Sequence, residues 1–472
     1  MMASRQIDFP RRHPWVILWA MLLGCGAARA EVLTVGGANS QYRSIPEAIA
    51  AARPGDTIRV FPGTYIVQLT IDKSIALEGE GQPTLRGTGH GSIIVITADR
   101  CVLKGFKLEH CGGDLQAEDS GILIKSNHNL IEGNELSDIL YGIYLLGASH
   151  NTIRGNTVRG RRELEEGERG AGLHMWNSPD NLIEGNTILE ARDGLYIQSS
   201  SRNTVRRNYV AHLRYGLHYM NSDDNRFDDN IFTNNVAGAA IMYSRRIELR
   251  RNAFLHNRGF SSFGILFQDC DAILAEDNYL IDNATGIFME ALRQSMFRRN
   301  VIAENDLALF IFSNSDATTV VDNNFIENLS PLQVVGRSTA IRWHEGGRGN
   351  YWSDYAGYDL DGNGIGDISH RVQNIFEYLE GNYPRLRLYL NSPAAQALAA
   401  AEKTFPLLRG SAELDRAPLM KAVALSIPLP MEQRPRATTR AIFIVMSLLI
   451  LGVSMSIIWK GQLKHSGRRG AK

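Results

Sequence analysis

One stretch decides the fold: Gly194-Leu-Tyr-Ile-Gln-Ser-Ser-Ser-Arg-Asn-Thr-Val-Arg-Arg-Asn208, which is followed by a second copy of the same plan, Gly216-Leu-His-Tyr-Met-Asn-Ser-Asp-Asp-Asn-Arg-Phe-Asp-Asp-Asn230. Each copy opens with glycine before a short apolar segment and closes with an apolar-x-x-Asn signal. The glycines recur at Gly121, Gly142, Gly172, Gly194, Gly216, Gly238, Gly264 and Gly286, and the asparagines at Asn134, Asn156, Asn186, Asn208, Asn230, Asn252, Asn278, Asn300 and Asn323.

The spacing of these asparagines is nearly constant, at 22, 30, 22, 22, 22, 26, 22 and 23 residues. Repeats of this length are stacked supersecondary units. Short β-rich segments between Gly and Asn, without helical periodicity, predict an all-β fold, a right-handed parallel β-helix with coils of about 22 residues. The Leu-x-x-Leu-x-Leu frame of leucine-rich repeats is absent. Asparagine tolerates left-handed backbone and bonds to neighbouring backbone, so we interpret the repeated asparagines as a structural ladder.

Two longer intervals mark insertions in the repeat, one over residues 160–169 and one over 258–262. Insertions in a solenoid form loops on one face and often flank its binding surface. A solvated loop without a role is the alternative for each. Upstream, residues 42–65 predict a short amphipathic helix and then a strand, which would cover the open first coil.

The charges of the chain balance, because Lys plus Arg and Asp plus Glu both number 50. This balance argues against a nucleic-acid partner, which a basic surface would bind. With 44% hydrophobic and 21% charged residues, the chain is neither disordered nor a polytopic membrane protein.

The amino terminus resembles a secretory signal over residues 1–30. Arg11 and Arg12 precede an apolar run over 15–23, and Ala28-Arg-Ala30 offers a cleavage site. An uncleaved anchor helix is the alternative. Cys101, Cys111 and Cys270 would remain after cleavage, an odd number that predicts no disulfide framework and leaves a Cys101–Cys111 bridge open.

The carboxyl terminus contains residues 441–459, which carry no charge and are long enough to cross a bilayer as a helix. We therefore expect an exported body anchored to the inner membrane, with residues 460–472 as a cytoplasmic tail. Between them, the sequence predicts a capped β-helix over 31–348, a Tyr/Trp-rich cap over 349–408 with a docking helix over 394–404, and a proline-interrupted flexible linker over 409–440.

Strand alternation assigns a face to each side chain of the repeat. The first and third residues after each glycine are apolar and belong to the core. The second and fourth face outward in five consecutive coils: Tyr144 and Leu146, His174 and Trp176, Tyr196 and Gln198, His218 and Met220, and Ala240 and Met242. We expect Tyr144, Trp176 and Tyr196 to form a surface on which a partner docks.

Soft ligands occur together within this stripe. His218 and Met220 share one coil, and Met242 lies in register on the next. Thioether sulfur selects copper(I), and imidazole also suits copper, so these three residues form a candidate copper(I) site. His174 lies two coils from His218, about 10 Å, and would be an entry or relay residue. A docking patch without metal is the alternative.

A second candidate site lies beyond the repeats. Oxygen ligands occupy positions 1, 3, 5 and 9 of a loop, as Asp359, Asp361, Asn363 and Asp367. Gly364 takes the sixth position, but His370 stands where a calcium loop has a bidentate Glu. Weak calcium binding and a plain Asx-rich turn both stay open.

Several motifs carry a resemblance to known families. Pro54-Gly-Asp-Thr-Ile58 and Pro62-Gly-Thr-Tyr65 are similar to segments of carbohydrate-binding and sugar-hydrolase β-helix proteins. The more specific motifs are Gly216-Leu-His-Tyr-Met-Asn-Ser-Asp-Asp-Asn225, Met242-Tyr-Ser-Arg245, Gly349-Asn-Tyr-Trp-Ser-Asp-Tyr355, Tyr358-Asp-Leu-Asp-Gly-Asn-Gly-Ile-Gly-Asp367 and Ser392-Pro-Ala-Ala-Gln-Ala-Leu398. Together they resemble the NosD family over about residues 31–422.

The resemblance implies a function. Members of this family are periplasmic proteins required to mature nitrous oxide reductase. It implies a non-enzymatic role in copper delivery, with the membrane subunits of an ABC transporter, a copper chaperone and the reductase as partners. The anchoring helix is not a feature that the resemblance predicts.

The rival class is a β-helix lyase, hydrolase or epimerase acting on an exported or cell-surface glycan. Fold alone proves no function. Glycoside hydrolysis needs two carboxylates at one groove, and the outward stripe contains almost none. No Asp-Pro-His-Asp epimerase motif occurs, and Asp223 and Asp224 fall in a turn. A surface adhesin, the third class, would not explain the His/Met stripe.

Overall fold

The computed structural model describes residues 30–336, 339–373, 392–394, 397 and 413–425. The chain divides into two units, residues 1–423 and 424–472, and the fold below belongs to the first. The expected signal segment, nearly all of the docking helix and the transmembrane segment at 441–459 lie outside the described residues. Within those that are described, no helix has the length and apolar character needed to span a membrane.

Three parallel sheets, here named A, B and C, contain 13, 13 and 12 strands. Sheet A consists of β1 (Val32–Val35), β2 (Thr57–Val60), β5 (Ala76–Gly79), β8 (Val102–Lys104), β11 (Leu130–Glu132), β14 (Thr152–Arg154), β17 (Leu182–Glu184), β20 (Thr204–Arg206), β23 (Arg226–Asp228), β26 (Glu248–Arg250), β29 (Leu274–Glu276), β32 (Met296–Arg298) and β35 (Thr319–Val321).

Sheet B consists of β3 (Thr64–Ile66), β6 (Thr84–Arg86), β9 (Lys107–Glu109), β12 (Glu135–Ile139), β15 (Thr157–Gly160), β18 (Thr187–Leu189), β21 (Tyr209–Ala211), β24 (Ile231–Thr233), β27 (Ala253–Leu255), β30 (Tyr279–Ile281), β33 (Val301–Ala303), β36 (Asn324–Ile326) and β38 (Tyr351–Trp352).

Sheet C consists of β4 (Leu69–Ile71), β7 (Ile94–Ile96), β10 (Ser120–Ile124), β13 (Tyr141–Leu146), β16 (Ala171–Trp176), β19 (Asp193–Gln198), β22 (Tyr215–Met220), β25 (Ala237–Met242), β28 (Ile265–Gln268), β31 (Thr285–Glu290), β34 (Leu307–Phe312) and β37 (Ser330–Val335).

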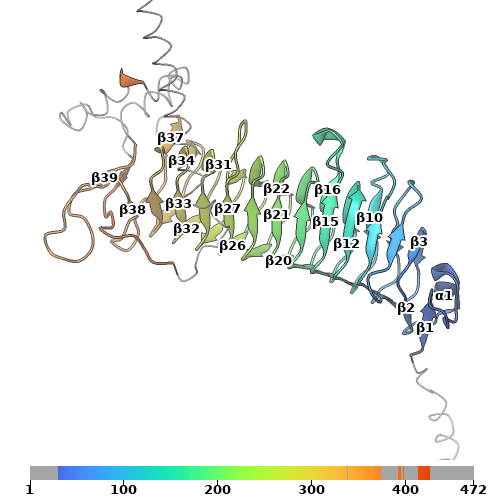
Figure 1. Ribbon diagram of the computed structural model, residues 1–472. Coiled ribbons are helices and arrows are strands. Elements are labelled where there is room, and N and C mark those ends of the chain that lie inside the picture. Colours follow the sequence, from blue (N-terminus) through green and yellow to red (C-terminus); the bar gives the residue numbers. More distant parts are fainter. Residues whose placement is uncertain (1–29, 337–338, 374–391, 395–396, 398–412, 426–472) are drawn as a thin grey trace, which may run out of the picture. The chain divides into compact units, whose positions relative to one another are not determined.

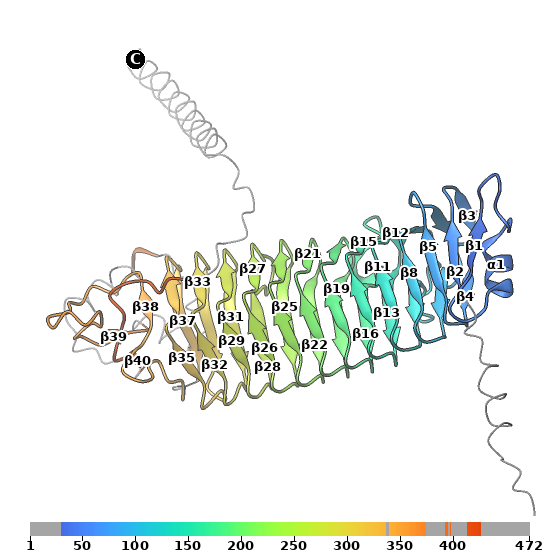
Figure 2. The same cartoon turned by 90° about the horizontal axis from the view of Figure 1, so that it is seen from below.

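The chain visits the sheets in the order C, A, B and then pairs each strand with its counterpart one coil on. In sheet C, for example, Leu195 aligns with Leu217 and Tyr196 with His218. Figures 1 and 2 show the strands stacked along one axis, from β2 at the blue end to β38. This is the all-β, right-handed type of parallel β-solenoid that the repeat predicts, with about 14 turns of about 22 residues. The predicted architecture is confirmed for the described part of the chain.

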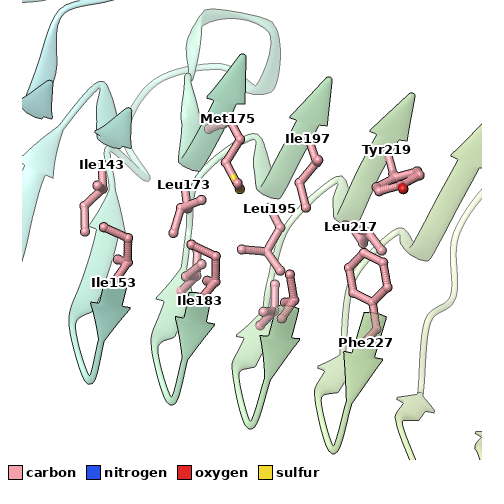
Figure 3. Packing of buried hydrophobic residues seen from close by; sticks show 14 of the residues in the cluster. Ile143, Ile153, Leu173, Met175, Ile183, Leu195, Ile197, Leu217, Tyr219 and Phe227 are labelled. Atoms are coloured by element: carbon pink, nitrogen blue, oxygen red, sulfur yellow. The ribbon is translucent and has the colours of Figure 1, made fainter. Parts of the chain in front are cut away.

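The core is a set of apolar rows that run along the axis. Figure 3 shows the inward side chains of sheet C facing those of sheet A, with Leu173, Leu195 and Leu217 in one row. All three are at most 1% exposed. Met175 fills space in this core, as predicted, and is 0% exposed. The inward side chains of a coil therefore face one another and stack on those of the neighbouring coils, which is how a repeat fold acquires a continuous core.

Asparagine ladders join the coils. The side chain of Asn208 donates to the Asn230 Oδ1 (2.9 Å) and to the carbonyl of Ile183 (3.0 Å), and it accepts from the backbone N–H of Asn186 (2.9 Å). The pattern runs from Asn134 to Asn350 and confirms the predicted structural ladder. Two further ladders, which the repeat analysis missed, run along Asn129, Asn151, Asn181, Asn203 and Asn225, and along Asn235, Asn257, Asn283, Asn305 and Asn328.

Charged residues alternate in sign at two of the three corners. One ladder follows the turn from sheet C to sheet A, and the other follows the turn from sheet A to sheet B. Arg202 holds Asp180 with two bonds of 2.8 Å, and Arg299 holds Asp277 with two bonds of 2.9 Å. The two ladders are Asp180, Arg202, Asp224, Arg246 and Arg207, Asp229, Arg251, Asp277, Arg299, Asp322, Arg348. Nearly all of these residues have left-handed backbone, which ends each strand sharply.

The amino-terminal cap forms as the sequence predicts. Helix α1 spans Ile45–Ala51, with Ser44 as its N-cap accepting from the backbone N–H of Glu47. Its buried face consists of Ile45, Ala48 and Ile49, and it contacts β1 and β2 at the first coil. The open end of the stack is thereby covered.

The carboxyl-terminal end differs from the expected linker. Residues 413–423, here named the C-terminal clasp, pack on the last coil, and β40 (Leu414–Asp415) pairs antiparallel with β39 (His370–Arg371). Asp415, 0% exposed, accepts from the Trp352 indole at 3.0 Å, and Glu413 accepts from the Trp343 indole at 2.8 Å. The prediction of a flexible linker is wrong for these residues, because prolines break helices but do not prevent extended chain from docking.

The three cysteines at positions 101, 111 and 270 are all free and buried. Cys101 and Cys111 therefore form no disulfide. Burial raises the pKa of the Cys111 thiol to about 11, so this thiol stays protonated and inert at neutral pH.

Candidate metal site on sheet C

A row of rings crosses the outer face of sheet C. Tyr144, His174, Tyr196 and His218 occupy the same register position on β13, β16, β19 and β22. Tyr144 stacks on His174 at 4.3 Å between ring centroids, whereas Tyr196 meets both His174 and His218 edge-on at 4.7 Å. These four side chains therefore lie on the outer face of sheet C, the orientation that strand alternation predicts.

His218 is fixed by a buried carboxylate. Its Nδ1 lies 3.1 Å from the Oδ2 of Asp193, which is 0% exposed at the start of β19. A histidine that bonds a carboxylate through Nδ1 presents Nε2 to a ligand, which is the arrangement that metal-binding histidines use. The His218 side chain itself is 15% exposed, so a ligand can reach it.

The hydrogen-bond partners of Asp193 keep its carboxyl group ionised. Arg214 holds it with two bonds, Nε to Oδ1 at 3.0 Å and Nη2 to Oδ2 at 2.8 Å. Burial opposes ionisation, but the hydrogen bonds from His218 and Arg214 outweigh it and hold the pKa of Asp193 below its usual value. The site thus contains a permanent anion behind His218.

Met220 and Met242 lie next to each other at the ends of β22 and β25. They are register partners, as are His218 and Ala240 two residues earlier. Both methionines are half-buried. Neighbouring strands lie about 4.8 Å apart, so two thioethers and one imidazole share a small area of the sheet. This donor set suits a soft ion such as copper(I).

Across the part of the chain that the structure describes, no group of three or more His, Cys, Asp and Glu side chains could hold a metal ion. A site on sheet C would therefore depend on its methionine sulfurs. Hard cations, which prefer oxygen ligands, have no such cluster on this face.

His174 lies beside this group but is not brought to it. It is 5% exposed, it has Tyr196 between itself and His218, and neither of its ring nitrogens has a hydrogen-bond partner among the residues that the structure describes. Burial lowers the pKa of His174 to about 4, so the ring is neutral at pH 7. Because Tyr196 separates them, His174 and His218 cannot share one ion, and the entry or relay role of His174 stays a prediction.

The three expected docking residues differ in exposure. Trp176 is 41% exposed and Tyr196 is partly buried, but Tyr144 is only 2% exposed. Tyr144 packs against Tyr141 and His174 and forms a hydrogen bond with Glu118 from the preceding loop. Strand alternation gives the direction of a side chain but not the loop that covers it, so Tyr144 contributes no exposed surface here.

The Asp-rich loop is held by its own backbone. The carboxylate of Asp359 accepts from the backbone N–H groups of Gly362 and Gly364, each at 2.8 Å, and Asp367 accepts from Leu360 at 2.7 Å. These bonds, chiefly the one from Gly364, lower the pKa of Asp359. His370 stacks on Trp352 at 4.8 Å instead of facing the loop. The loop has the form of an Asx-rich turn, and calcium binding by Asp359, Asp361, Asn363 and Asp367 stays a prediction.

The sequence analysis missed Asp193 and Arg214. A signal for Asp193 exists, because the residue before the repeat glycine is Tyr141, Ala171, Tyr215 or Ala237 in the neighbouring coils and acidic only here. Arg214 gives no such signal, since arginine is frequent throughout the repeats.

Two family models and two curated relatives match this chain. A family model described as periplasmic copper-binding protein (NosD) matches residues 160–357, and a family of unknown function matches residues 33–249. A probable ABC transporter binding protein NosD from Pseudomonas aeruginosa is 30% identical over 439 residues, 89% of this chain and 98% of the relative. A protein of the same description from Stutzerimonas stutzeri is 30% identical over 77% of this chain and 86% of its own length.

Among solved structures, the A-module of the mannuronan C-5 epimerase AlgE4 from Azotobacter vinelandii has a similar fold. The TM-score is 0.51 at 14% identity, over 63% of this chain and 93% of the module. A likeness at this identity concerns the fold alone. The two relatives, by contrast, are 30% identical over 89% and 77% of this chain, and the chain therefore belongs to the NosD family.

Proposed function

We propose that this protein is a periplasmic accessory protein that binds copper(I) and passes it on, together with an ABC transporter, for the maturation of nitrous oxide reductase. The family description and the names of the two relatives support a role with copper and with a transporter. Copper is cargo in this proposal, and the protein catalyses no reaction on it.

The proposed ligands are the Nε2 of His218 and the sulfurs of Met220 and Met242. One observation carries the proposal: the two methionines are register partners beside a histidine whose other nitrogen is held by buried Asp193. Three soft ligands on an open sheet face leave one position of a copper(I) ion for a ligand from a partner, which allows release by exchange. His174 would contact the ion before or after this site.

The proposed partners are the membrane subunits of the transporter, a copper chaperone and the reductase. Tyr196 lies beside His218, and Trp176 lies two strands from Met220 on the same face; both would contact the partner that delivers or receives the ion. Large exposed aromatic side chains are enriched at protein interfaces.

The membrane anchor is a separate part of the proposal and depends on the sequence of residues 441–459. Protease added to spheroplasts should release a soluble body of this protein into the medium. A body that stays protected until the cells are lysed would contradict the proposed topology.

Anaerobic copper(I) titration against a competing chelator tests the site. We expect the triple variant His218→Ala, Met220→Leu, Met242→Leu to lose the tight copper(I) site. The matched control is His128→Ala with Met296→Leu, which removes the same kinds of side chain from other coils. Equal affinity in the wild-type protein and the triple variant would place the site elsewhere and leave the stripe as a docking surface.

An enzyme that acts on a glycan is the alternative, and one observation favours it. His218 and Tyr196, with Asp193 behind them, are acid–base groups on an outer sheet face. Incubation with alginate, pectate and other acidic oligosaccharides would reveal unsaturated or epimerised products. We expect none, and any turnover that is lost in His218→Ala would support the enzyme instead.

A further inference from the structure

A cluster of apolar side chains lies on the outer face of sheet C, beyond the proposed copper ligands. The phenylalanine patch, as it is named here, consists of Phe263, Leu266, Phe288, Phe310 and Phe312. Four of its members come from the neighbouring strands β28, β31 and β34, and Phe263 precedes β28. Leu266 aligns with Phe288, and Phe288 aligns with Phe310. All five side chains are half-buried, so each keeps part of its surface exposed.

The rings pack on one another across the strands. The ring centroid of Phe288 lies 5.1 Å from that of Phe310, 5.5 Å from that of Phe312 and 6.1 Å from that of Phe263. Phe263 directly follows the second insertion, whose Phe260 is 96% exposed. The insertion thus borders the patch. A contiguous apolar surface of this kind marks a site of interaction.

One carboxylate lies next to this apolar surface. The five consecutive strands of sheet C from β25 to β37 contain a single charged residue, Glu290. Its Oε2 accepts a hydrogen bond from the side-chain amide of Gln268 at 3.1 Å. Within the described part of the chain, Glu290 has no cationic partner. A half-buried carboxylate beside aromatic rings therefore favours a partner that brings a cation.

Carboxylates also outnumber cations in the turns on both sides of the patch. The turns after β28, β31 and β34 contain three aspartates and one arginine, which are Asp269, Asp271, Asp316 and Arg293. The turns before these strands contain Asp282, Glu304 and Asp306 together with Arg258 and His256. Arg293 pairs with Asp269 at 2.7 Å, and Arg258 pairs with Asp282 at 2.6 Å. These surroundings suit a basic segment and disfavour an acidic one.

The spacing of the strands fits an α-helix that lies along the axis of the stack. Neighbouring strands lie about 4.8 Å apart, and a helix rises about 5.4 Å per turn. One side chain per turn can therefore contact each successive strand, and the mismatch over β28, β31 and β34 is only about 1 Å. In an extended segment along the same axis, side chains on one face recur about every 6.6 Å and fall out of step by about 4 Å.

We propose that the phenylalanine patch is the docking surface for an amphipathic helix of a partner protein, which packs its apolar face on the rings and places a lysine or arginine against Glu290. Interface cores are enriched in aromatic side chains and depleted of charge, as this patch is. The inference rests on the proposed function and deepens it, because it states the chemistry of the partner that exchanges copper with this protein. Met242 aligns with Gln268, so a helix on the patch lies one strand from a proposed ligand.

Two other occupants fit the patch less well. A bilayer would have to take the carboxylate of Glu290 out of water, which costs several kcal/mol. The planes of the contacting phenylalanine rings are tilted by between 46° and 85° to one another. They therefore do not form the flat platform on which a sugar ring stacks.

The test measures binding of a fluorescent model peptide by anisotropy to the copper-free, full-length protein in nanodiscs of neutral lipid, with empty nanodiscs as the blank. The peptide is a stapled helix of alanine and glutamine with leucines at one-turn spacing and one central lysine. Because copper is absent, the result is independent of whether His218, Met220 and Met242 bind it. We expect saturable binding, which Phe310→Thr should weaken at least about tenfold because a ring leaves the contact.

Leu266→Thr and Leu123→Thr form a matched pair. They make the same change in the same row of outward side chains, the first inside the patch and the second on β10. Leu266→Thr should weaken binding about threefold to tenfold, since buried apolar area is lost, whereas Leu123→Thr should bind like the wild-type protein. Failure of the wild-type protein to bind the peptide, or equal effects of the two changes, would overturn the proposal.

Glu290→Gln tests the charge with a second peptide, in which glutamine replaces the lysine. We expect this variant to bind the lysine peptide about threefold more weakly than the wild-type protein and the glutamine peptide equally well, because a partly exposed ion pair contributes about this much. Equal effects on both peptides would overturn the assignment of a cation to the partner.

Photo-crosslinking identifies the occupant directly. With p-benzoylphenylalanine in place of Phe310, illumination should yield an adduct with the lysine peptide. An adduct with lipid or with a second copy of this chain, formed in preference to the peptide, would overturn the proposal. Displacement of the peptide by a neutral glycan such as mannohexaose would also overturn it.

Discussion

The Oδ2 of Asp193 on β19 lies 3.1 Å from the Nδ1 of His218 on β22, the neighbouring strand one coil further along. We expect Asp193→Asn to lower the copper(I) affinity about 10- to 100-fold, because a neutral amide no longer fixes the imidazole or raises its basicity. Asp224→Asn, which removes an exposed carboxylate bonded to Arg246, is the matched control. A folded Asp193→Asn protein with unchanged affinity would show that Asp193 does not support a metal ligand.

The buried ring of His174 makes stability depend on pH. Its folded pKa, about 4, is below the unfolded value of 6.5, so the unfolded chain binds the extra proton first as the pH falls. Its contribution is fully present above pH 6.5 and is lost between pH 6.5 and about 4, amounting to about 3 kcal/mol. His174→Phe keeps the stacked ring and removes this dependence. Urea unfolding of both proteins at pH 7.5 and pH 4.5 measures the difference, and parallel curves would contradict the prediction.

Removal of one ladder asparagine should lower the free energy of unfolding, because its neighbours in the ladder lose hydrogen-bond partners. Asn208→Ala removes the oxygen that accepts from both the buried backbone N–H and the side-chain amide of Asn186. Each buried group left unpaired costs about 1–3 kcal/mol, so we expect a loss of about 2–5 kcal/mol. Arg162→Ala, on a side chain that is 81% exposed, should change stability by less than about 0.5 kcal/mol. Comparable denaturation midpoints for the two variants would refute a stabilising role of the ladder.

Detachment of the C-terminal clasp should be measurable by tryptophan fluorescence. Asp415→Ala removes the acceptor of the Trp352 indole and of the Asn350 backbone N–H. We expect lower stability and a red shift of tryptophan fluorescence, because Trp352 is 1% exposed and gains contact with water when the clasp leaves. Arg416→Ala, beside it but exposed, is the control. An unshifted spectrum in Asp415→Ala would mean that another contact retains the clasp.

The sequence predicts the periodic part of the molecule and little of what interrupts it. Gly216, Asn230 and their counterparts recur because every coil faces the same neighbours, so one coil predicts the next. An acidic residue precedes the repeat glycine only at Asp193. Its pairing with His218 can be predicted only when both the strand register and this position before the glycine are known. The cover over Tyr144 depends on a loop conformation, which no period encodes. The clasp depends on a contact of residues 63 positions apart, Trp352 and Asp415.

The alternating corner charges have a consequence for the evolution of length. Excision of one coil, for instance residues 216–237, would place Arg202 beside Arg246 at one corner and Arg207 beside Arg251 at the other. Excision of two adjacent coils would place Arg207 beside Asp277, which keeps opposite signs in contact at the corner between sheets A and B, and would place Arg202 beside uncharged Ala272 at the other corner. Relatives that have gained or lost coils in this region should therefore differ by even numbers of coils, so the charge pattern imposes a parity rule on a fold that could otherwise change length one unit at a time.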